Sequence, residues 1–289
     1  MIHSPPAASA TRILAGLLES RTGQQIAPSR YWRIQSALAP ILKAQGIPDL
    51  DALVAVLSDP DNEQLLQASL DAMLNNESFF FRDTAIFAAL RSEAFPALRE
   101  RRAHRKTLRI WSAGTSTGQE AYSVAMLVDS ERDKWTDWKI EIIGTDISPS
   151  VIARARTGRY SQFEIQRGLS VDYMLRYFAQ DGEDWVIDPR LQAMVRFQED
   201  NLLKPRAELG RFDIILCRNV LMYFAPETRH IAYSKLERSL ENDGMLMLGA
   251  AETVLGQTEL FSATREMRGL YSKASGGLSG QSIIPPPLR

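Results

Sequence analysis

The sequence is short of the residues that cross-link a chain or hold a structural metal. Only one of its 289 residues is cysteine, Cys217, so no disulfide can form within the chain and a reducing cytoplasm is the expected compartment. The histidines, at positions 3, 104 and 230, are scattered. A zinc site of Cys and His ligands cannot be assembled from such spacing, and we expect no metal.

Long apolar runs and an excess of one charge are missing as well. No stretch approaches the roughly 18 uncharged apolar residues of a membrane span, and the N-terminus lacks the basic and apolar regions of a signal peptide. Lys and Arg number 34 against 35 Asp and Glu, a net charge of −1. Proteins dedicated to nucleic acid usually carry a basic excess, so we expect no nucleic-acid partner and no membrane insertion.

The composition is that of a folded protein with two domains. Hydrophobic residues make up 45% of the chain and charged residues 24%, and the length fits two domains of roughly 150 residues. Residues 1–9 are small and proline-rich, and we expect them to be disordered. Residues 10–83 show apolar side chains at helical spacing only, which predicts an all-helical N-terminal domain.

Strands alternate with helices after residue 107. This rhythm predicts a mainly parallel, doubly wound sheet over 108–274, an α/β fold. Segment 84–107 is interpreted as a linker with a connecting helix, and 275–289 as a flexible tail. Between 173 and 197 the rhythm breaks into short apolar runs around an acidic turn, which we interpret as an inserted β-subdomain. The main strands are expected at 108–111, 140–144, 212–217 and 244–248.

The first of these strands enters a loop of small residues, 112–118. Small residues let the backbone approach a ligand closely, and the helix that follows offers unpaired N–H groups. Asp146 follows the next strand, where an acid can bind both hydroxyls of a ribose. Loop and acid suit an adenosine ligand, either a dinucleotide or S-adenosylmethionine, and these residues alone do not separate the two.

Two further segments carry unusual residues. Segment 75–83 holds three consecutive phenylalanines among polar residues, which does not fit a simple amphipathic helix. The apolar strand at 212–217 ends in Arg218 and Asn219, and Tyr223 follows. Polar groups at the carboxyl end of a central strand lie where doubly wound folds bind ligands.

These segments resemble the chemotaxis receptor methyltransferases, the CheR family. The resemblance is carried, in this order, by NESFFFRD at 76–83, IWSAGTSTGQEAYS at 110–123, GTDIS at 144–148 and CRNVLMYF at 217–224. It extends from about Ala10 to Lys273. It implies a class I S-adenosylmethionine-dependent methyltransferase domain with a Rossmann-like doubly wound sheet, an all-helical N-terminal domain and a small inserted β-subdomain.

The resemblance also implies roles for individual residues. Glu120 would hold the amino end of the methionine moiety and Asp146 the ribose hydroxyls, and Arg82 and Tyr223 would lie near the reactive methyl group. Ser78 stands where the family often has threonine. The residues implied to bind S-adenosylmethionine, or its product S-adenosylhomocysteine, are Asn76, Ser78, Arg82, Ala113, Gly114, Glu120, Asp146, Asn201, Leu202, Asn219 and Val220.

The implied reaction is methylation of glutamate side chains on the cytoplasmic helical region of membrane chemoreceptors, the methyl-accepting chemotaxis proteins. The γ-glutamyl methyl esters formed would serve sensory adaptation. A glutamate, with a reference pKa of about 4.3, is already ionised at pH 7, so no general base is needed. We expect Arg82 to orient this carboxylate and Tyr223 to give a hydrogen bond. The protein would be a cytoplasmic monomer recruited to receptor arrays.

Basic residues mark the expected substrate surface. The resemblance places Arg30, Arg33 and Lys43 against the acidic receptor. The basic stretches 99–109 and 154–167 would extend this field, although the first also fits a solvated helix end. Some family members carry an extended glycine-rich loop that captures a pentapeptide at the receptor's C-terminus. Here the corresponding turn is short and acidic, which predicts no pentapeptide tethering.

Three other functions fit parts of the sequence. A class I methyltransferase could act on a nucleic acid, another protein or a small molecule, and near-zero charge disfavours the nucleic acid. A non-catalytic signalling module could bind S-adenosylmethionine, but Arg82, Glu120, Asp146, Asn219 and Tyr223 are all retained. An NAD oxidoreductase is disfavoured because the only glycines of the loop, Gly114 and Gly118, have the wrong spacing.

Overall fold

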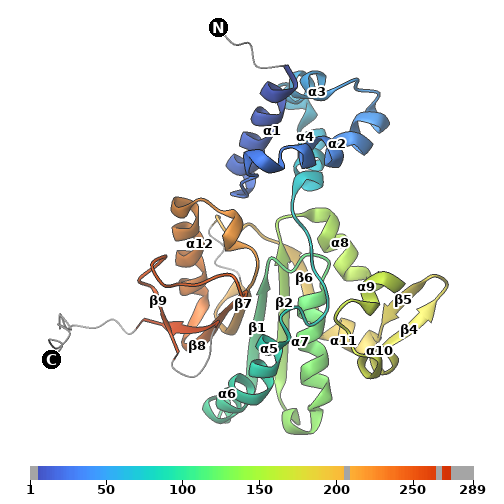
Figure 1. Ribbon diagram of the computed structural model, residues 1–289. Helices are drawn as coiled ribbons and strands as arrows, with labels where there is room; N and C mark the ends of the chain where they lie inside the picture. Colours follow the sequence, from blue (N-terminus) through green and yellow to red (C-terminus); the bar gives the residue numbers. More distant parts are fainter. Residues whose placement is uncertain (1–5, 205–208, 265–268, 275–289) are drawn as a thin grey trace, which may run out of the picture.

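A cluster of helices lies above one edge of a seven-stranded sheet in the computed structural model (Figure 1). The structure describes residues 6–204, 209–264 and 269–274. The disorder expected for 1–5 and the tail expected at 275–289 lie outside these residues. Within the described ranges, no helix is both long and apolar enough to cross a membrane.

The helical cluster is built from α1 (Pro6–Thr22), α2 (Trp32–Gln45), α3 (Leu50–Leu57) and α4 (Glu63–Met73). It has a core of its own, and its fully buried members include Leu14, Leu18, Ile34, Leu38 and Leu53. Because α1 begins at Pro6, the disorder expected through residue 9 is wrong for 6–9. Proline is tolerated in the first turn of a helix, since the N–H groups there lack partners anyway.

The sheet has the strand order β6-β2-β1-β7-β8-β10-β9. The first five strands run parallel, and β10 and β9 are antiparallel additions at one edge. The chain leaves β1 toward β2 on one side and later returns to β7 on the other, so the carboxyl ends of β1 and β7 flank the crevice where such sheets bind ligands. The expected α/β class is confirmed. The strands are β1 (Thr107–Ala113), β2 (Lys139–Asp146), β6 (Val195–Glu199), β7 (Phe212–Cys217), β8 (Leu240–Leu248), β9 (Phe261–Ala263) and β10 (Leu270–Lys273).

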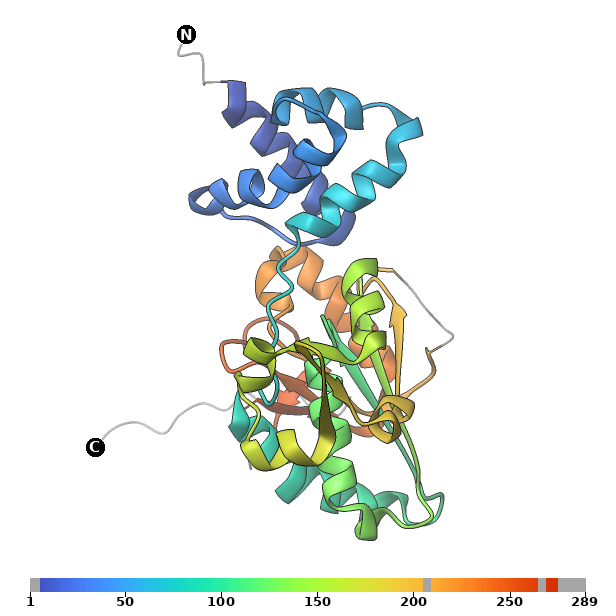
Figure 2. The same cartoon turned by 90° about the vertical axis from the view of Figure 1, so that its right-hand side faces the viewer.

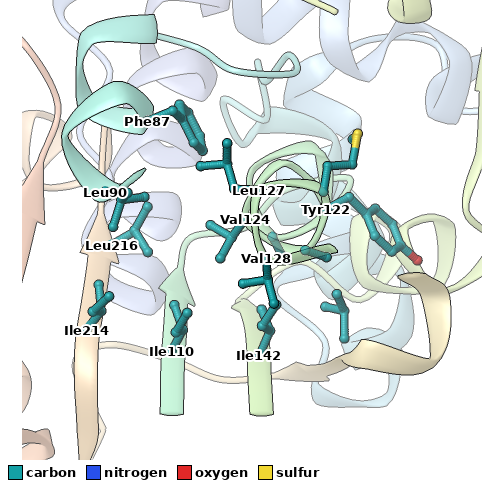
Figure 3. Packing of buried hydrophobic residues seen from close by; sticks show 14 of the residues in the cluster. Phe87, Leu90, Ile110, Tyr122, Val124, Leu127, Val128, Ile142, Ile214 and Leu216 are labelled. Carbon is teal, nitrogen blue, oxygen red and sulfur yellow. The ribbon is translucent and has the colours of Figure 1, made fainter. Parts of the chain in front are cut away.

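Helices cover both faces of the sheet, as a parallel sheet requires. On one face α7 (Gln119–Ser130) turns Val124, Leu127 and Val128 toward the strand residues Ile110, Ile142 and Ile214 (Figure 3). On the other face lies α12 (Pro226–Ser239), where Tyr233 and Leu236 pack with buried residues such as Trp111 and Ile215. Shorter helices are α8 (Pro149–Thr157) and α11 (Pro189–Met194), with 3-10 turns at Pro28–Arg30, Pro60–Asn62, Arg132–Trp135 and Leu221–Tyr223.

Segment 84–107 contains the helix that was expected, but it packs into the sheet domain, so the expectation of a linker there is wrong. It forms α5 (Thr84–Ala89), a π-helical turn (Leu90–Ala94) and α6 (Phe95–Arg102). Phe87 and Leu90 face the same core as α7 (Figure 3), and Phe95 and Leu98 are fully buried. These apolar side chains cover the sheet and hold the segment in place. The connection between the two domains is the shorter stretch 74–83.

The basic stretch 99–109 is occupied by ion pairs within the chain. Asp213, buried in β7, accepts hydrogen bonds from Arg102 and Arg105 at 2.7 Å each and from the backbone N–H of Arg109 at 2.8 Å. The Arg109 side chain pairs with Glu141 at 2.6 Å. These pairs leave little free charge for a docking surface, whereas Arg101, His104, Arg105 and Lys106 are exposed around the end of α6, as expected for a solvated helix end. In 154–167, Arg154, Arg159 and Arg167 are likewise paired, with Glu164, Asp181 and Glu77.

The inserted subdomain has different bounds from those expected (Figure 1). Its antiparallel sheet has the order β3-β5-β4 and begins before residue 173, while Val195–Glu199 is β6 of the main sheet. Phe197 of β6 lies over Gly144 of β2, where an added Cβ would come within 2.6 Å of its ring. The absence of a side chain at residue 144 leaves room for this ring where β6 pairs with β2. The subdomain comprises β3 (Arg159–Ser161), α9 (Gln162–Gln166), α10 (Val171–Tyr177), β4 (Phe178–Asp181) and β5 (Asp184–Ile187).

Candidate functional site

The helical domain lies beyond the carboxyl ends of the central strands and is joined to the sheet domain by the connecting stretch 74–83 (Figure 2). A pocket lies at this junction, beside the ends of β1, β2 and β7. Residues from both domains line it, including Thr22 and Gln24 of the helical domain. Ala113, in contrast, is fully buried in β1 and does not line the pocket. The other residues implied for cofactor binding or catalysis all do: Asn76, Ser78, Arg82, Gly114, Glu120, Asp146, Asn201, Leu202, Asn219, Val220 and Tyr223.

The loop after β1 forms one wall. The backbone N–H groups of Gly114 and Thr115 both donate to the carbonyl of Thr145 at 2.8 Å, which fastens the loop to the end of β2. Gly114 has a φ of 79° and faces Val220 so closely that an added Cβ would lie 2.4 Å from the Val220 methyl. Glycine is therefore required at this position by both conformation and space.

Asp146 presents a buried carboxylate to this loop. Its oxygens accept the backbone N–H groups of Ser116 at 2.8 Å and Ser148 at 3.1 Å. Burial raises the pKa of the Asp146 carboxyl above its ordinary value, although these backbone hydrogen bonds act in the opposite direction. A carboxylate has about four acceptor positions, so both oxygens can still accept from a neighbouring pair of hydroxyls.

Arg218 lies beneath Glu120 and Asp83. Its guanidinium, only 1% exposed, donates to Glu120 at 2.8 Å and to Asp83 at 2.9 Å, and also to the carbonyl of Arg82. Ser112 donates to the second oxygen of Glu120 at 2.7 Å. Two carboxylates around one guanidinium leave a net negative charge beside the pocket, which suits a ligand ammonium group.

Glu252 supports the turn that follows β7. Its carboxylate accepts the backbone N–H groups of Asn219, Val220, Met222 and Gly249 at 2.6–3.1 Å. Asn219 adopts a left-handed conformation with φ 58°. Sequence reasoning missed Glu252, because it lies more than 30 residues from the turn and belongs to none of the recognised motifs.

Replacing Glu252 by glutamine should lower the free energy of unfolding by about 1–3 kcal/mol, because the amide turns donors toward backbone N–H groups that need an acceptor. Chemical unfolding measures this change. Glu259→Gln, at an exposed position, serves as the control and should stay within about 0.5 kcal/mol of the parent protein. Equal effects of the two substitutions would contradict the proposed support.

A buried ion pair positions the loop that carries Asn201 and Leu202. Lys235 of α12 donates to Asp200 at 2.7 Å and to the carbonyl of Asn201 at 2.8 Å. Leu202 is buried, and its side chain forms an apolar part of the pocket wall together with Val220. Sequence reasoning did not identify Lys235, since only tertiary packing brings α12 beneath this loop.

Arg82 and Tyr223 lie on the side of the pocket toward the connecting stretch. The Arg82 guanidinium donates to the carbonyl of Glu77 at 2.9 Å and lies 5.4 Å from the centre of the Phe79 ring. The Tyr223 hydroxyl accepts a hydrogen bond from the side-chain amide of Asn75. Tyr223 thereby connects the sheet domain with the end of the helical domain.

A second hollow adjoins the pocket and shares Gln24, Asn75 and Tyr223 with it. Arg30 and Arg33 of the helical domain line this hollow. Lys43, exposed near the end of α2, lines neither hollow. Two of the three basic residues expected to face the substrate therefore line the same hollow as Tyr223.

The chemistry of the pocket suits an adenosyl amino acid. Asp146 can accept a vicinal diol, Leu202 and Val220 offer apolar walls to a flat base, and Glu120 offers negative charge to an ammonium. In the described parts of the chain, no three side chains of His, Cys, Asp or Glu are grouped so that they could bind a metal ion together.

Comparison with known proteins agrees with this geometry. Residues 76–269 match the family described as CheR methyltransferase, SAM binding domain. Chemotaxis protein methyltransferase Cher2 of Pseudomonas putida is 33% identical over 261 residues, covering 89% of this chain and 94% of that protein. The chemotaxis protein methyltransferase of Vibrio parahaemolyticus is 34% identical over 265 residues, 91% and 95% of the two chains. Chemotaxis protein methyltransferase 1 of Pseudomonas aeruginosa is 35% identical over 241 residues, 82% and 87%.

Proposed function

Since the chain belongs to the CheR methyltransferase family and is an S-adenosylmethionine-dependent methyltransferase, we propose that it methylates glutamate side chains on the cytoplasmic helical region of chemoreceptors. The observation that carries the proposal is the junction of the two hollows. The pocket suited to the methyl donor shares Gln24, Asn75 and Tyr223 with a hollow that Arg30 and Arg33 line together with Glu19. Two arginines against one glutamate give this hollow a positive lining, which suits an acidic side chain.

The residues of the pocket would hold the donor, which supplies an electrophilic methyl group. Asp146 would bind the ribose hydroxyls, Leu202 and Val220 the adenine, and Glu120 the ammonium, with Asn76, Ser78, Gly114, Asn201 and Asn219 completing the walls. A carboxylate nucleophile needs no general base at neutral pH. The main contribution of the protein is therefore alignment of the reacting groups, an effect that can reach about 7–11 kcal/mol.

Arg82 and Tyr223 are proposed as the catalytic residues. The Arg82 guanidinium donates one hydrogen bond, to the carbonyl of Glu77, and lies over the Phe79 ring. A guanidinium has five N–H donors, so the remaining ones can orient a substrate carboxylate. A fully desolvated pair with this carboxylate would stabilise the ground state and slow methyl transfer. We therefore propose a guiding contact from Arg82 and a hydrogen bond from Tyr223.

The surface beside the opening fits a helix rich in glutamate. Arg30 and Arg33 lie on either side of Trp32, a residue that is 67% exposed, and Lys43 is exposed near the far end of α2. Such charges raise the encounter rate with an acidic partner and lose effect as salt increases. We propose that the protein acts in the cytoplasm as a monomer at receptor arrays, where this substrate would be found.

Transfer of labelled methyl groups to receptor cytoplasmic domains tests the proposed function. The expected product is a label released by mild alkali, as a carboxyl methyl ester requires. A variant receptor with glutamines at the labelled glutamates is the matched control and should take up no label. Alkali-stable label, or transfer to nucleic acid or a small molecule and not to the receptor, would contradict the proposal.

We also propose that the protein acts without binding a pentapeptide at the receptor's C-terminus. Strands β4 and β5 are joined by only Gly182 and Glu183, and Asp181 and Asp184 beside this turn pair with Arg159. So short a turn leaves no loop to close over an added strand. Calorimetry with a receptor-tail peptide should show no binding, while S-adenosylhomocysteine serves as the positive control. Micromolar affinity for the peptide would overturn the proposal that the protein acts without it.

A further inference from the structure

The side-chain amide of Asn75 lies between a basic residue of the helical domain and the Tyr223 hydroxyl. Arg33 donates to the amide oxygen at 3.3 Å, and the amide nitrogen donates to the phenol oxygen of Tyr223. Two further hydrogen bonds hold the backbones of Asn75 and Tyr223. The N–H of Asn75 donates to the side-chain oxygen of Gln24 at 3.2 Å, and the N–H of Gln25 donates to the carbonyl of Tyr223 at 2.8 Å.

Elementary hydrogen-bond chemistry fixes the orientation of this amide. A guanidinium has donors and no acceptor, so Arg33 can only face the amide oxygen. The amide NH2 group must then face Tyr223, and the phenol oxygen must accept. The proton of the Tyr223 hydroxyl is consequently directed away from Asn75, and Tyr223 lines both the donor pocket and the arginine-lined hollow.

We propose that Asn75 is a positioning residue that keeps the Tyr223 hydroxyl available as a hydrogen-bond donor to the substrate carboxylate, with Arg33 setting the orientation of the amide. The proposal rests on the proposed function, since it concerns a carboxylate acceptor. A carboxylate offers only acceptors, so a phenol whose proton was bound to residue 75 would present lone pairs to it. Arg33 would then act on the reaction centre as well as on receptor binding.

Two substitutions of similar size separate this role from a merely structural one. In Asn75→Asp the carboxylate accepts from both Arg33 and Tyr223, which captures the phenol proton. We expect kcat at saturating receptor to fall about 100-fold, a size typical of losing a hydrogen bond to a charged group. In Asn75→Leu the phenol loses a partner but keeps its proton free, and kcat should fall less than about 10-fold.

Two comparisons distinguish a positioning role of Asn75 from a structural one: the order of the two kcat effects, and a double-substitution cycle with Tyr223. In a Tyr223→Phe background, Asn75→Asp should change kcat by less than about 3-fold, because the hydroxyl through which it acts is missing. The new charge also repels an acidic receptor, so kcat is compared and not KM. Calorimetric affinity for S-adenosylhomocysteine should match the parent protein in each variant, which verifies that the pocket is folded.

Each outcome bears on one proposal. Asn75→Asp with the parent kcat, Asn75→Leu with the same loss as Asn75→Asp, or a full loss persisting in the Tyr223→Phe background would overturn the role of Asn75. Absence of receptor methylation by the parent protein would instead contradict the proposed function. If Asn75→Asp does not bind S-adenosylhomocysteine, the test rests on Asn75→Leu. A fall in the kcat of Asn75→Leu of more than about 10-fold relative to the parent protein would then overturn the role of Asn75.

Discussion

Replacing Arg218 by methionine should lower the free energy of unfolding by about 3–5 kcal/mol, the range found when one partner of a buried ion pair is removed. Methionine keeps much of the volume of the arginine stem, so the loss is mainly electrostatic. Glu120 and Asp83 would be left facing each other with no shared cation. Because Glu120 borders the pocket, affinity for S-adenosylhomocysteine should fall as well.

Chemical unfolding measures this effect, with Arg190→Met as the matched control. Arg190 pairs with Asp188 on the surface, and its side chain is 61% exposed. Surface pairs contribute about 0–1 kcal/mol, so the control should change little. Similar losses for Arg218 and Arg190 would show that the guanidinium beneath Glu120 does not hold the site together.

Asp146→Ala should weaken S-adenosylhomocysteine binding by about 100-fold or more, since two hydroxyls would lose a charged acceptor. Isothermal calorimetry measures the affinity, and Asp172→Ala, at an exposed position of α10, serves as the control. An affinity unchanged by Asp146→Ala would remove this carboxylate from the ligand site.

The same carboxylate gives a pH dependence of known sign. Burial raises the pKa of Asp146, and ribose hydroxyls favour its ionised form. Affinity for S-adenosylhomocysteine should therefore be complete above this pKa and decline as the pH falls through it, beginning at a higher pH than for an ordinary aspartate. Asp146→Asn should abolish this component of the pH profile.

The site residues that could be predicted from the sequence are those at the carboxyl ends of the parallel strands. Asp146 and Asn219 come directly after apolar strands, and the carboxyl ends of parallel strands meet at one edge, so their arrival in one pocket was foreseeable. Glu252 and Lys235 were not foreseeable in this way. Each acts on backbone 30 or more residues away in the chain, and no local pattern records such a contact.

Two errors in the predicted fold have similar causes. Segment 84–107 is rich in arginine, which is typical of an exposed linker. Its apolar residues Phe87, Leu90 and Phe95 pack on the sheet, and this contact cannot be predicted from the segment alone. The alternation of Val195 and Phe197 fits a strand of either sheet, and in the structure this strand pairs with β2, with Phe197 lying over Gly144. Packing partners, and not the local pattern, determine both assignments.

The pocket is shared by two domains, each with a hydrophobic core of its own. A ligand held there touches both, so its binding free energy opposes their separation, by about 2.7 kcal/mol at a concentration 100 times its Kd. Methyl donor and spent product have the same adenosyl and amino acid groups, so both would oppose this separation to a similar degree. The connecting stretch is itself fastened to the sheet domain, because Phe80 is buried in the core of that domain and Ser116 donates to the carbonyl of Asn76.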